Sequence, residues 1–268
     1  MYICRHTIIQ FRMALLEISI LGSGTSQGIP VVGCTCDVCR SSDTRDKRLR
    51  TAALLQHNGT TVAIDAGPDF RQQMLREQVR RLNGIVMTHN HKDHTAGIDD
   101  VRAFNWIQQE PMNIYARGSV LSAIKEEFFY AFEENPYPGV PDINLNELDG
   151  SPFRIGGLEL TPIDAMHHRM PVYGYRTGDF SYLTDANYIE TSELDKMKGS
   201  RFVVINALRK EKHISHFTLE EAVDILQYLR PEKGFITHIS HQMGKHREVE
   251  KELPKGIFLA RDSMKVYC

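Results

Sequence analysis

The heptapeptide Thr88–His94, THNHKDH, directly follows the short apolar run 84–87 and decides what kind of fold the chain needs. An uncharged apolar run of this length is typical of a buried strand, so the histidines begin where a strand ends. Neutral imidazole and carboxylate groups are ligands that zinc and manganese accept. Four such side chains fall within six residues: His89, His91, Asp93 and His94. A polar loop that merely contains histidines is the alternative, but this spacing lets the side chains converge, as a two-metal site requires.

The size and charge of the chain limit the remaining possibilities. The 268 residues are 41% hydrophobic and contain no low-complexity linker, which favours a single domain over residues 14–268 after an N-terminal extension, 1–13. Lys+Arg 32 against Asp+Glu 34 gives a net charge of -2, which excludes a general electrostatic attraction to nucleic acid or to an anionic membrane. No apolar stretch approaches eighteen residues and the start is a poor signal peptide, so we expect a cytoplasmic protein without membrane contact.

The cysteines point to a second metal site. Three of the five lie in one short loop, 33–40, as Cys34, Cys36 and Cys39. Cysteines this close cannot all pair with one another, and in a reducing compartment they indicate metal ligation rather than disulfides. A tetrahedral zinc ion would need a fourth ligand from elsewhere in the chain.

The order of predicted elements indicates a layered α/β protein. Strands are expected at 15–21, 52–56, 61–65, 84–87, 112–115, 157–163, 172–176, 180–183, 202–206 and 234–236, and helices at 68–78, 95–109, 121–132, 192–197 and 219–229. The Asn58-Gly59 pair predicts a hairpin between the second and third strands. The second half repeats the element order of the first, which suggests two facing sheets with helices outside.

More candidate ligands follow strands in the second half, and convergence of strand ends would bring them to one edge. They are His167 or His168, Asp185 and His238. Only one of two adjacent strand residues can face a site, so His167 and His168 are alternatives. Asp65 follows the third strand; it either orients a ligand histidine or closes a turn.

Together, IDAGPD at 64–69, THNHKDH, TDA at 184–186 and THISH at 237–241 make the chain resemble the metallo-β-lactamase superfamily. The resemblance implies an α/β fold, the αββα sandwich of two mixed sheets flanked by helices. Within that superfamily the chain is most similar to the PhnP-like phosphoribosyl cyclic phosphodiesterases of the carbon-phosphorus lyase pathway. Those proteins combine a dinuclear site with a zinc ion held by a C-x-C-x2-C loop and a histidine, which here are Cys34, Cys36, Cys39 and His241.

The resemblance also implies roles for the other residues. One metal ion would be held by His89, His91 and His167, the other by Asp93, His94 and His238, with Asp185 as the bridge. His167 is preferred to His168 because the following Arg-Met-Pro-Val aligns better from there. Asp93 would act in catalysis as a ligand, and His216 as the general acid; a surface histidine beside a helix start is the alternative for His216.

The expected function is therefore a metal-dependent phosphodiesterase with two manganese or zinc ions, one structural zinc and a small, cyclic or linear, phosphorylated substrate. A homodimer is expected by resemblance alone, and nucleic acid is not expected as a partner. A tRNase Z-like nuclease and a PqqB-like, non-hydrolytic metal protein remain alternatives. The basic residues Arg209, Lys210 and Lys212 either grip an anionic substrate or form a solvated face.

Overall fold

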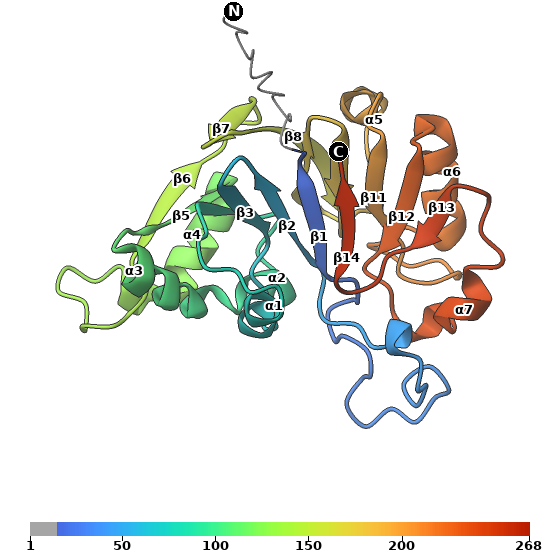
Figure 1. Cartoon of the computed structure of the whole chain (residues 1–268), viewed down its shortest axis with the longest axis horizontal. Coiled ribbons are helices and arrows are strands. Elements are labelled where there is room, and N and C mark those ends of the chain that lie inside the picture. Colours follow the sequence, from blue (N-terminus) through green and yellow to red (C-terminus); the bar gives the residue numbers. More distant parts are fainter. Residues whose placement is uncertain (1–14) are drawn as a thin grey trace, which may run out of the picture.

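Two seven-stranded sheets face each other in the computed structural model, which describes residues 15–268 (Figure 1). The predicted extension 1–13 lies outside these residues. The first sheet has the order β14-β1-β2-β3-β4-β5-β6, with β1 Glu17–Gly22, β2 Ala52–His57, β3 Thr60–Ile64, β4 Gly84–Val86, β5 Met112–Ala116, β6 Ile143–Glu147 and β14 Met264–Tyr267. The second has the order β13-β12-β11-β10-β9-β8-β7, with β7 Phe153–Ile155, β8 Leu158–His167, β9 Met170–Thr177, β10 Phe180–Leu183, β11 Phe202–Asn206, β12 Lys233–Thr237 and β13 Ile257–Leu259.

Each sheet is half antiparallel and half parallel. In the first, β14, β1, β2 and β3 are antiparallel neighbours, whereas β3 to β6 run parallel. In the second, β7 to β10 are antiparallel and β10 to β13 are parallel. The expected repetition of element order is therefore a repetition of sheet architecture, and polar loops after β3, β4, β10 and β12 can meet at one edge.

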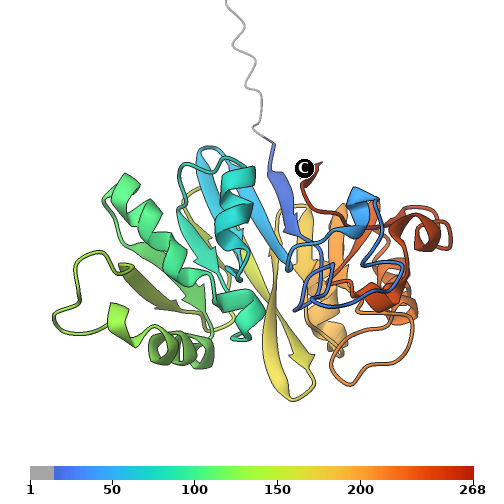
Figure 2. The same ribbon diagram turned by 90° about the horizontal axis from the view of Figure 1, so that it is seen from below.

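Helices cover the outer faces of both sheets (Figures 1 and 2). Their bounds are α1 Phe70–Arg76, α2 Lys92–Thr95, α3 Arg102–Gln108, α4 Gly118–Glu127, α5 Thr191–Met197, α6 Leu219–Leu229 and α7 His246–Val249, with 3₁₀ turns η1 Thr44–Asp46, η2 Ile98–Val101, η3 Phe129–Ala131 and η4 His241–Met243. Successive side chains of a strand point to opposite faces of its sheet and so pack in different apolar layers. Val204 of β11 packs between the sheets, while Val203 and Ile205 pack under α6. The predicted αββα sandwich is confirmed.

The hairpin between β2 and β3 is also confirmed. Asn58 and Gly59 have φ values of 48° and 77°. Positive φ at both central residues matches the right-handed twist of the flanking strands. The two-residue turn sets the register of the hairpin, in which His57 pairs with Thr60.

The helix predicted over 95–109 is wrong, since α2, η2 and α3 replace it. The break lies at Gly97, whose N–H donates to the Ala66 carbonyl oxygen over 2.9 Å. A Cβ on Gly97 would lie 2.1 Å from the Gly67 carbonyl oxygen, so only glycine allows this approach. The contact ties the segment after the histidines to the turn after β3.

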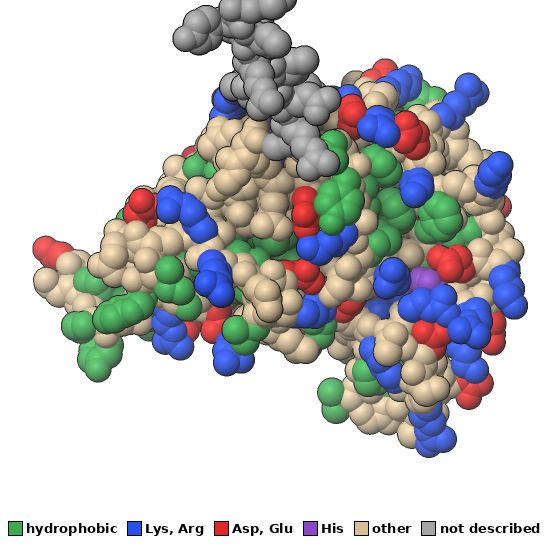
Figure 3. Space-filling model, in the orientation of Figure 1, with side chains coloured by type: hydrophobic (Ala, Val, Ile, Leu, Met, Phe, Trp, Pro, Cys, Tyr) green, Lys and Arg blue, Asp and Glu red, His purple; other side chains and the backbone are tan. Residues whose placement is uncertain are grey.

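On the face shown in Figure 3, Lys and Arg side chains are most numerous at the lower right, where some Asp and Glu side chains lie among them. The whole sequence nevertheless carries a small net charge of -2. Among residues 15–268, no helix has the length and apolar character needed to cross a membrane.

Candidate metal centre

The histidine loop is held in place from both sheets. After β4, the Thr88 N–H donates to Asp65 Oδ1 over 2.8 Å, and Asp65 itself is fully buried at the end of β3. From the second sheet, the Tyr175 hydroxyl donates to the Met87 carbonyl oxygen over 2.7 Å, and the Tyr173 N–H donates to the Thr88 carbonyl oxygen over 3.0 Å. The loop is therefore anchored to both sheets by hydrogen bonds within the chain, and the two tyrosines had no signal in the sequence.

One group of candidate ligands combines the loop with the end of β8. One ligand atom from each of His89, His91 and His167 lies within 4.8 Å of the others. The chain turns directly after His167, where His168 has a left-handed backbone with φ 57°. The side chain of His168 is exposed as a result. The structure thus brings His167, and not His168, into this group.

A second group lies beside the first. Its members are Asp93, His94, Asp185 and His238. His94 Nε2 is 3.1 Å from both Asp93 Oδ2 and Asp185 Oδ2, and His238 Nδ1 is 3.0 Å from Asp185 Oδ2. Asp185 also belongs to a third cluster with His167 and His216. Asp185 therefore lies between the two groups, in the position expected of a ligand shared by two metal ions.

Three residues of this centre have left-handed backbones at strand ends. Asp65, Asp185 and His238 have φ values of 66°, 52° and 57°. They follow β3, β10 and β12 respectively. Non-glycine residues adopt this conformation at a cost and tend to do so at functional sites. The abrupt turn at each strand end directs a polar side chain to the shared edge.

The candidate histidines are oriented by their second ring nitrogen. His94 Nδ1 lies 2.7 Å from Asp65 Oδ2, and His167 Nδ1 lies 2.7 Å from the Ser215 carbonyl oxygen. His238 Nε2 lies 3.0 Å from Thr25 Oγ1. Metal-ligating histidines are commonly held this way by an oxygen on the far side of the ring. Of the two interpretations of Asp65, the structure supports the orienting one, while Thr25 and Ser215 could not be recognised in the sequence.

The nitrogens that face inward make no hydrogen bonds among residues 15–268. His89 Nε2, His94 Nε2 and His238 Nδ1 are buried without a hydrogen-bonding partner. Buried polar atoms are rarely left in this state, and here carboxylate oxygens lie near two of them without forming hydrogen bonds. Lone pairs that converge on a common point suit a cation, so the residues fit divalent metal ions.

The electrostatics favour the same occupant. Burial lowers the pKa of His89 and His238, which keeps these rings neutral, as metal ligation requires. Burial also opposes a proton on His94, but Asp185, Asp65 and Asp93 outweigh it and raise the pKa of His94 well above its ordinary value. Burial alone would raise the pKa of Asp185, yet His238 and His94 hold it well below the usual range. The carboxylates therefore draw positive charge into this pocket.

His216 lies against this centre and is buried, so the interpretation as a surface histidine is wrong. Its Nδ1 is 3.7 Å from Asp185 Oδ1, and its pKa is lowered to about 3, chiefly by burial and then by His238. The Phe217 N–H donates to the Ala186 carbonyl oxygen, which holds His216 beside Asp185. A capping box of Thr218 and Glu221 begins α6 directly afterwards.

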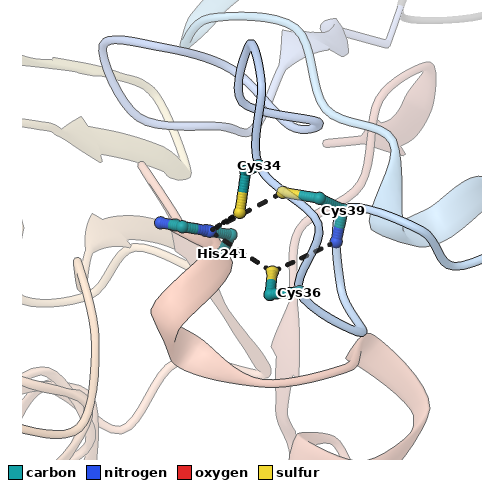
Figure 4. A group of neighbouring side chains, drawn as sticks. All are labelled: Cys34, Cys36, Cys39 and His241. Atoms are coloured by element: carbon teal, nitrogen blue, oxygen red, sulfur yellow. Dashed lines mark hydrogen bonds between the residues drawn. The ribbon is translucent and has the colours of Figure 1, made fainter.

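The cysteine loop forms a separate centre with His241 (Figure 4). His241 Nδ1 lies 3.3 Å from Cys34 Sγ, 3.4 Å from Cys36 Sγ and 3.6 Å from Cys39 Sγ. Ligand atoms bound to one tetrahedral zinc ion at about 2.0 and 2.3 Å would lie about 3.5 Å apart. The Cys39 N–H and the His241 ring lower the pKa of Cys36 to about 6, which favours the thiolate that binds metal.

A cleft of about 440 Å³ opens beside the first group of histidines. It is lined by His91, His167, His168, Arg169, Met170, Ile214 and Ser215. Two of the three basic residues considered as substrate contacts bind other side chains: Arg209 donates to Gln242 Oε1 over 2.7 Å, and Lys210 pairs with Glu252 over 2.6 Å. Neither residue lines the cleft, whereas Arg169 does.

Replacing Asp65 with Asn is expected to weaken metal binding by about 10- to 100-fold, because the carboxylate that orients His94 is lost while the shape is kept. Titration with a competing chelator measures the affinity. Asp100→Asn, a partly exposed carboxylate in η2, is the matched control and should bind metal like the wild type. Equal affinity in all three proteins would contradict the orienting role of Asp65.

Comparisons with known proteins agree with this geometry. The model of the β-lactamase superfamily domain matches residues 60–239. The crystal structure of a diphosphatase from the PhnP family aligns with a TM-score of 0.89 and 36% identity, covering 95% of this chain and 97% of that one. An octanoyltransferase of Porphyromonas gingivalis is 39% identical over 248 residues, which are 91% of this chain and 50% of that protein.

Coenzyme PQQ synthesis protein B of Rhodopseudomonas palustris is 28% identical over 169 residues, covering 56% of this chain and 52% of that protein. The chain thus spans about half the length of these two curated relatives. The superfamily resemblance noted from the sequence motifs is confirmed, and the diphosphatase similarity supports a metal-dependent hydrolase. Because the superfamily domain model matches more than half of the residues of this chain, the chain belongs to the β-lactamase superfamily.

Proposed function

We propose that this chain is a metal-dependent phosphodiesterase that hydrolyses a small phosphate diester, cyclic diesters included. The observation that carries the proposal is the position of Asp185 between two groups of inward-facing ligands, with His216 against it. A pair of manganese or zinc ions would be held by His89, His91 and His167 on one side and by Asp93, His94 and His238 on the other, with Asp185 shared. Such a pair, when bound, supplies a hydroxide near neutral pH and positive charge for the phosphoryl group.

The residues of the chain contribute to the remaining steps. Asp93 and Asp185 offset the positive charge that would otherwise push the histidines apart. His216 gives a proton to the leaving oxygen, and an anionic diester beside it favours the protonated ring despite the low pKa in the free protein. The buried setting of these groups strengthens their interactions with the substrate.

Turnover of a panel of cyclic and linear phosphodiesters by manganese- and zinc-loaded protein tests the proposal, with metal content measured on the same sample. We expect release of a phosphate monoester from at least one diester and about two active-site ions per chain, the number a two-metal mechanism requires. A precursor tRNA in the panel separates the nuclease alternative. No hydrolysis of any phosphodiester by either metal form would refute the proposal.

The same proposal includes a third metal ion, a cellular location and an oligomeric state. Cys34, Cys36, Cys39 and His241 would hold a structural zinc ion, because four protein ligands leave no position for substrate. The substrate would be a small phosphorylated molecule in the cytoplasm, without nucleic acid or membrane as partner, and the assembly a homodimer. Light scattering during size exclusion tests the assembly.

Cys36→Ser is expected to remove about one zinc equivalent per chain and to lower the thermal midpoint, since a structural zinc contributes directly to folding free energy. Elemental analysis and a thermal scan measure the two effects. Cys268→Ser is the control, because Cys268 lies at the C-terminus after β14. Unchanged zinc content in Cys36→Ser would mean that the cysteine loop binds no metal.

A further inference from the structure

Arg169 occupies a rigid position at the rim of the candidate metal centre. The pairing of β8 with β9 continues to His167 and Met170, which leaves His168 and Arg169 as a two-residue turn. The His168 N–H donates to Asn187 Oδ1 over 2.6 Å, which fixes the turn from the side. Short hairpin turns of this kind hold their backbone tightly. The base of the Arg169 side chain is therefore placed by the sheet.

The guanidinium of Arg169 is unpaired within the part of the chain that the structure describes. Within residues 15–268 it makes no hydrogen bond and no ion pair, unlike Arg154, whose guanidinium pairs with Glu159 on the neighbouring strand. Arg169 lines the 440 Å³ cleft together with His91 and His167, and no acidic residue lines that cleft. A positive charge is thus available beside the first group of ligands, where a bound substrate would extend.

We propose that Arg169 is a specificity-determining residue that binds a second phosphoryl group of the substrate. This inference rests on the proposed function and narrows its substrate class to diesters or anhydrides that carry a second phosphoryl group next to the one attacked. Guanidinium offers a fork of donors that matches two phosphoryl oxygens, and such charge-assisted pairs are among the stronger hydrogen bonds. Met170 and Ile214 provide apolar surface in the same cleft for the organic part of the substrate.

The chemistry remains a simple hydrolysis. One water is consumed, a new P–O bond forms to its oxygen, and the ester or anhydride P–O bond breaks. The leaving oxygen receives a proton from His216, and the proton released by the water restores His216 through the solvent. Arg169 is positively charged throughout and exchanges no proton. Its contribution is to favour substrates in which the second anionic group reaches the cleft.

The test compares two substrates in the metal-loaded full chain: the p-nitrophenyl esters of thymidine 5′-monophosphate and of thymidine 5′-diphosphate, with products separated by chromatography. In Arg169→Gln we expect kcat/KM for the diphosphate ester to fall about 10- to 100-fold and that for the monophosphate ester to fall less than about 3-fold. Arg169→Lys should lie between. Arg154→Gln is the matched control and should leave both substrates unchanged.

The outcomes separate the two proposals. If the wild type hydrolyses the monophosphate ester and Arg169→Gln changes both substrates equally or neither, the role of Arg169 is refuted while the proposed function stands. If the wild type hydrolyses neither ester, the proposed function fails on these substrates. Binding of a methylenediphosphonate ester to the metal-loaded wild type and to Arg169→Gln then decides the role of Arg169 alone: equal affinity refutes it, and at least tenfold weaker binding in the variant supports it.

Discussion

Asp185→Asn is expected to reduce phosphodiester turnover by at least about 10³-fold and to lower the metal content of the chain. Asp185 is buried: its Oδ2 lies near His94 and His238 of the second group, and its Oδ1 lies near His216. Asp185 also clusters with His167 of the first group. Asn keeps the shape but removes the negative charge and one anionic ligand atom. Two cations held close together would then repel each other without a shared carboxylate between them. Steady-state kinetics and elemental analysis on the same preparation measure both effects.

The matched control for this experiment is Asp179→Asn. Asp179 precedes the same strand, β10, and its exposed carboxylate lies 3.8 Å from Arg201. Loss of one exposed ion pair changes stability by less than about 1 kcal/mol, so activity and metal content should match the wild type. An Asp185→Asn variant that retains full metal content and turnover would remove the shared-ligand interpretation.

His216→Asn is expected to slow hydrolysis of a diester with an alkoxide leaving group by roughly 10² to 10⁴-fold, while metal content stays unchanged. The reason is that an alkoxide must receive a proton as it departs, whereas p-nitrophenolate leaves without one. The same variant should therefore slow hydrolysis of a p-nitrophenyl diester far less. Comparing kcat on the two substrates isolates proton donation from any general disturbance of the centre.

The control for His216 is its neighbour His213, whose ring centroid lies 5.1 Å away. His213 is only partly buried and lies in none of the three groups of candidate ligands around Asp185. His213→Asn should change the two substrates by similar, small factors. An equal loss on both substrates in His216→Asn would show that His216 supports the structure and does not supply the proton.

The interior of the fold could be predicted from the sequence, whereas its edges could not. The central strands are apolar runs with β-branched residues, and α6 shows a clear helical period with its capping box. The four strands that were not predicted, β6, β7, β13 and β14, are the four edge strands of the two sheets. Edge strands are short and half-solvated, so they lack the apolar run or strict alternation by which buried strands are recognised.

The candidate site shows a similar division. Ligand-type residues could be found because they cluster after strands and match motifs, and the structure brings all eleven proposed ligands into their groups. The residues that orient them could not be found. Thr25 contacts His238, which is 213 positions away in the sequence, and the Ser215 carbonyl oxygen contacts His167, which is 48 positions away. The first contact depends on how the two sheets meet, because Thr25 follows β1 and His238 follows β12. The second uses a backbone carbonyl oxygen, which carries no residue-type signal.

The left-handed turns at the strand ends limit how this centre can change during evolution. Side chains that tolerate such turns are chiefly glycine, asparagine, aspartate and histidine. Of the residues that bind metals well, only aspartate and histidine belong to that set. Glutamate or cysteine at position 185 or 238 would add backbone strain to the change of ligand, because the φ values there are 52° and 57°. Descendants of this protein can therefore alter the surrounding cleft far more easily than the chemical nature of these two ligands.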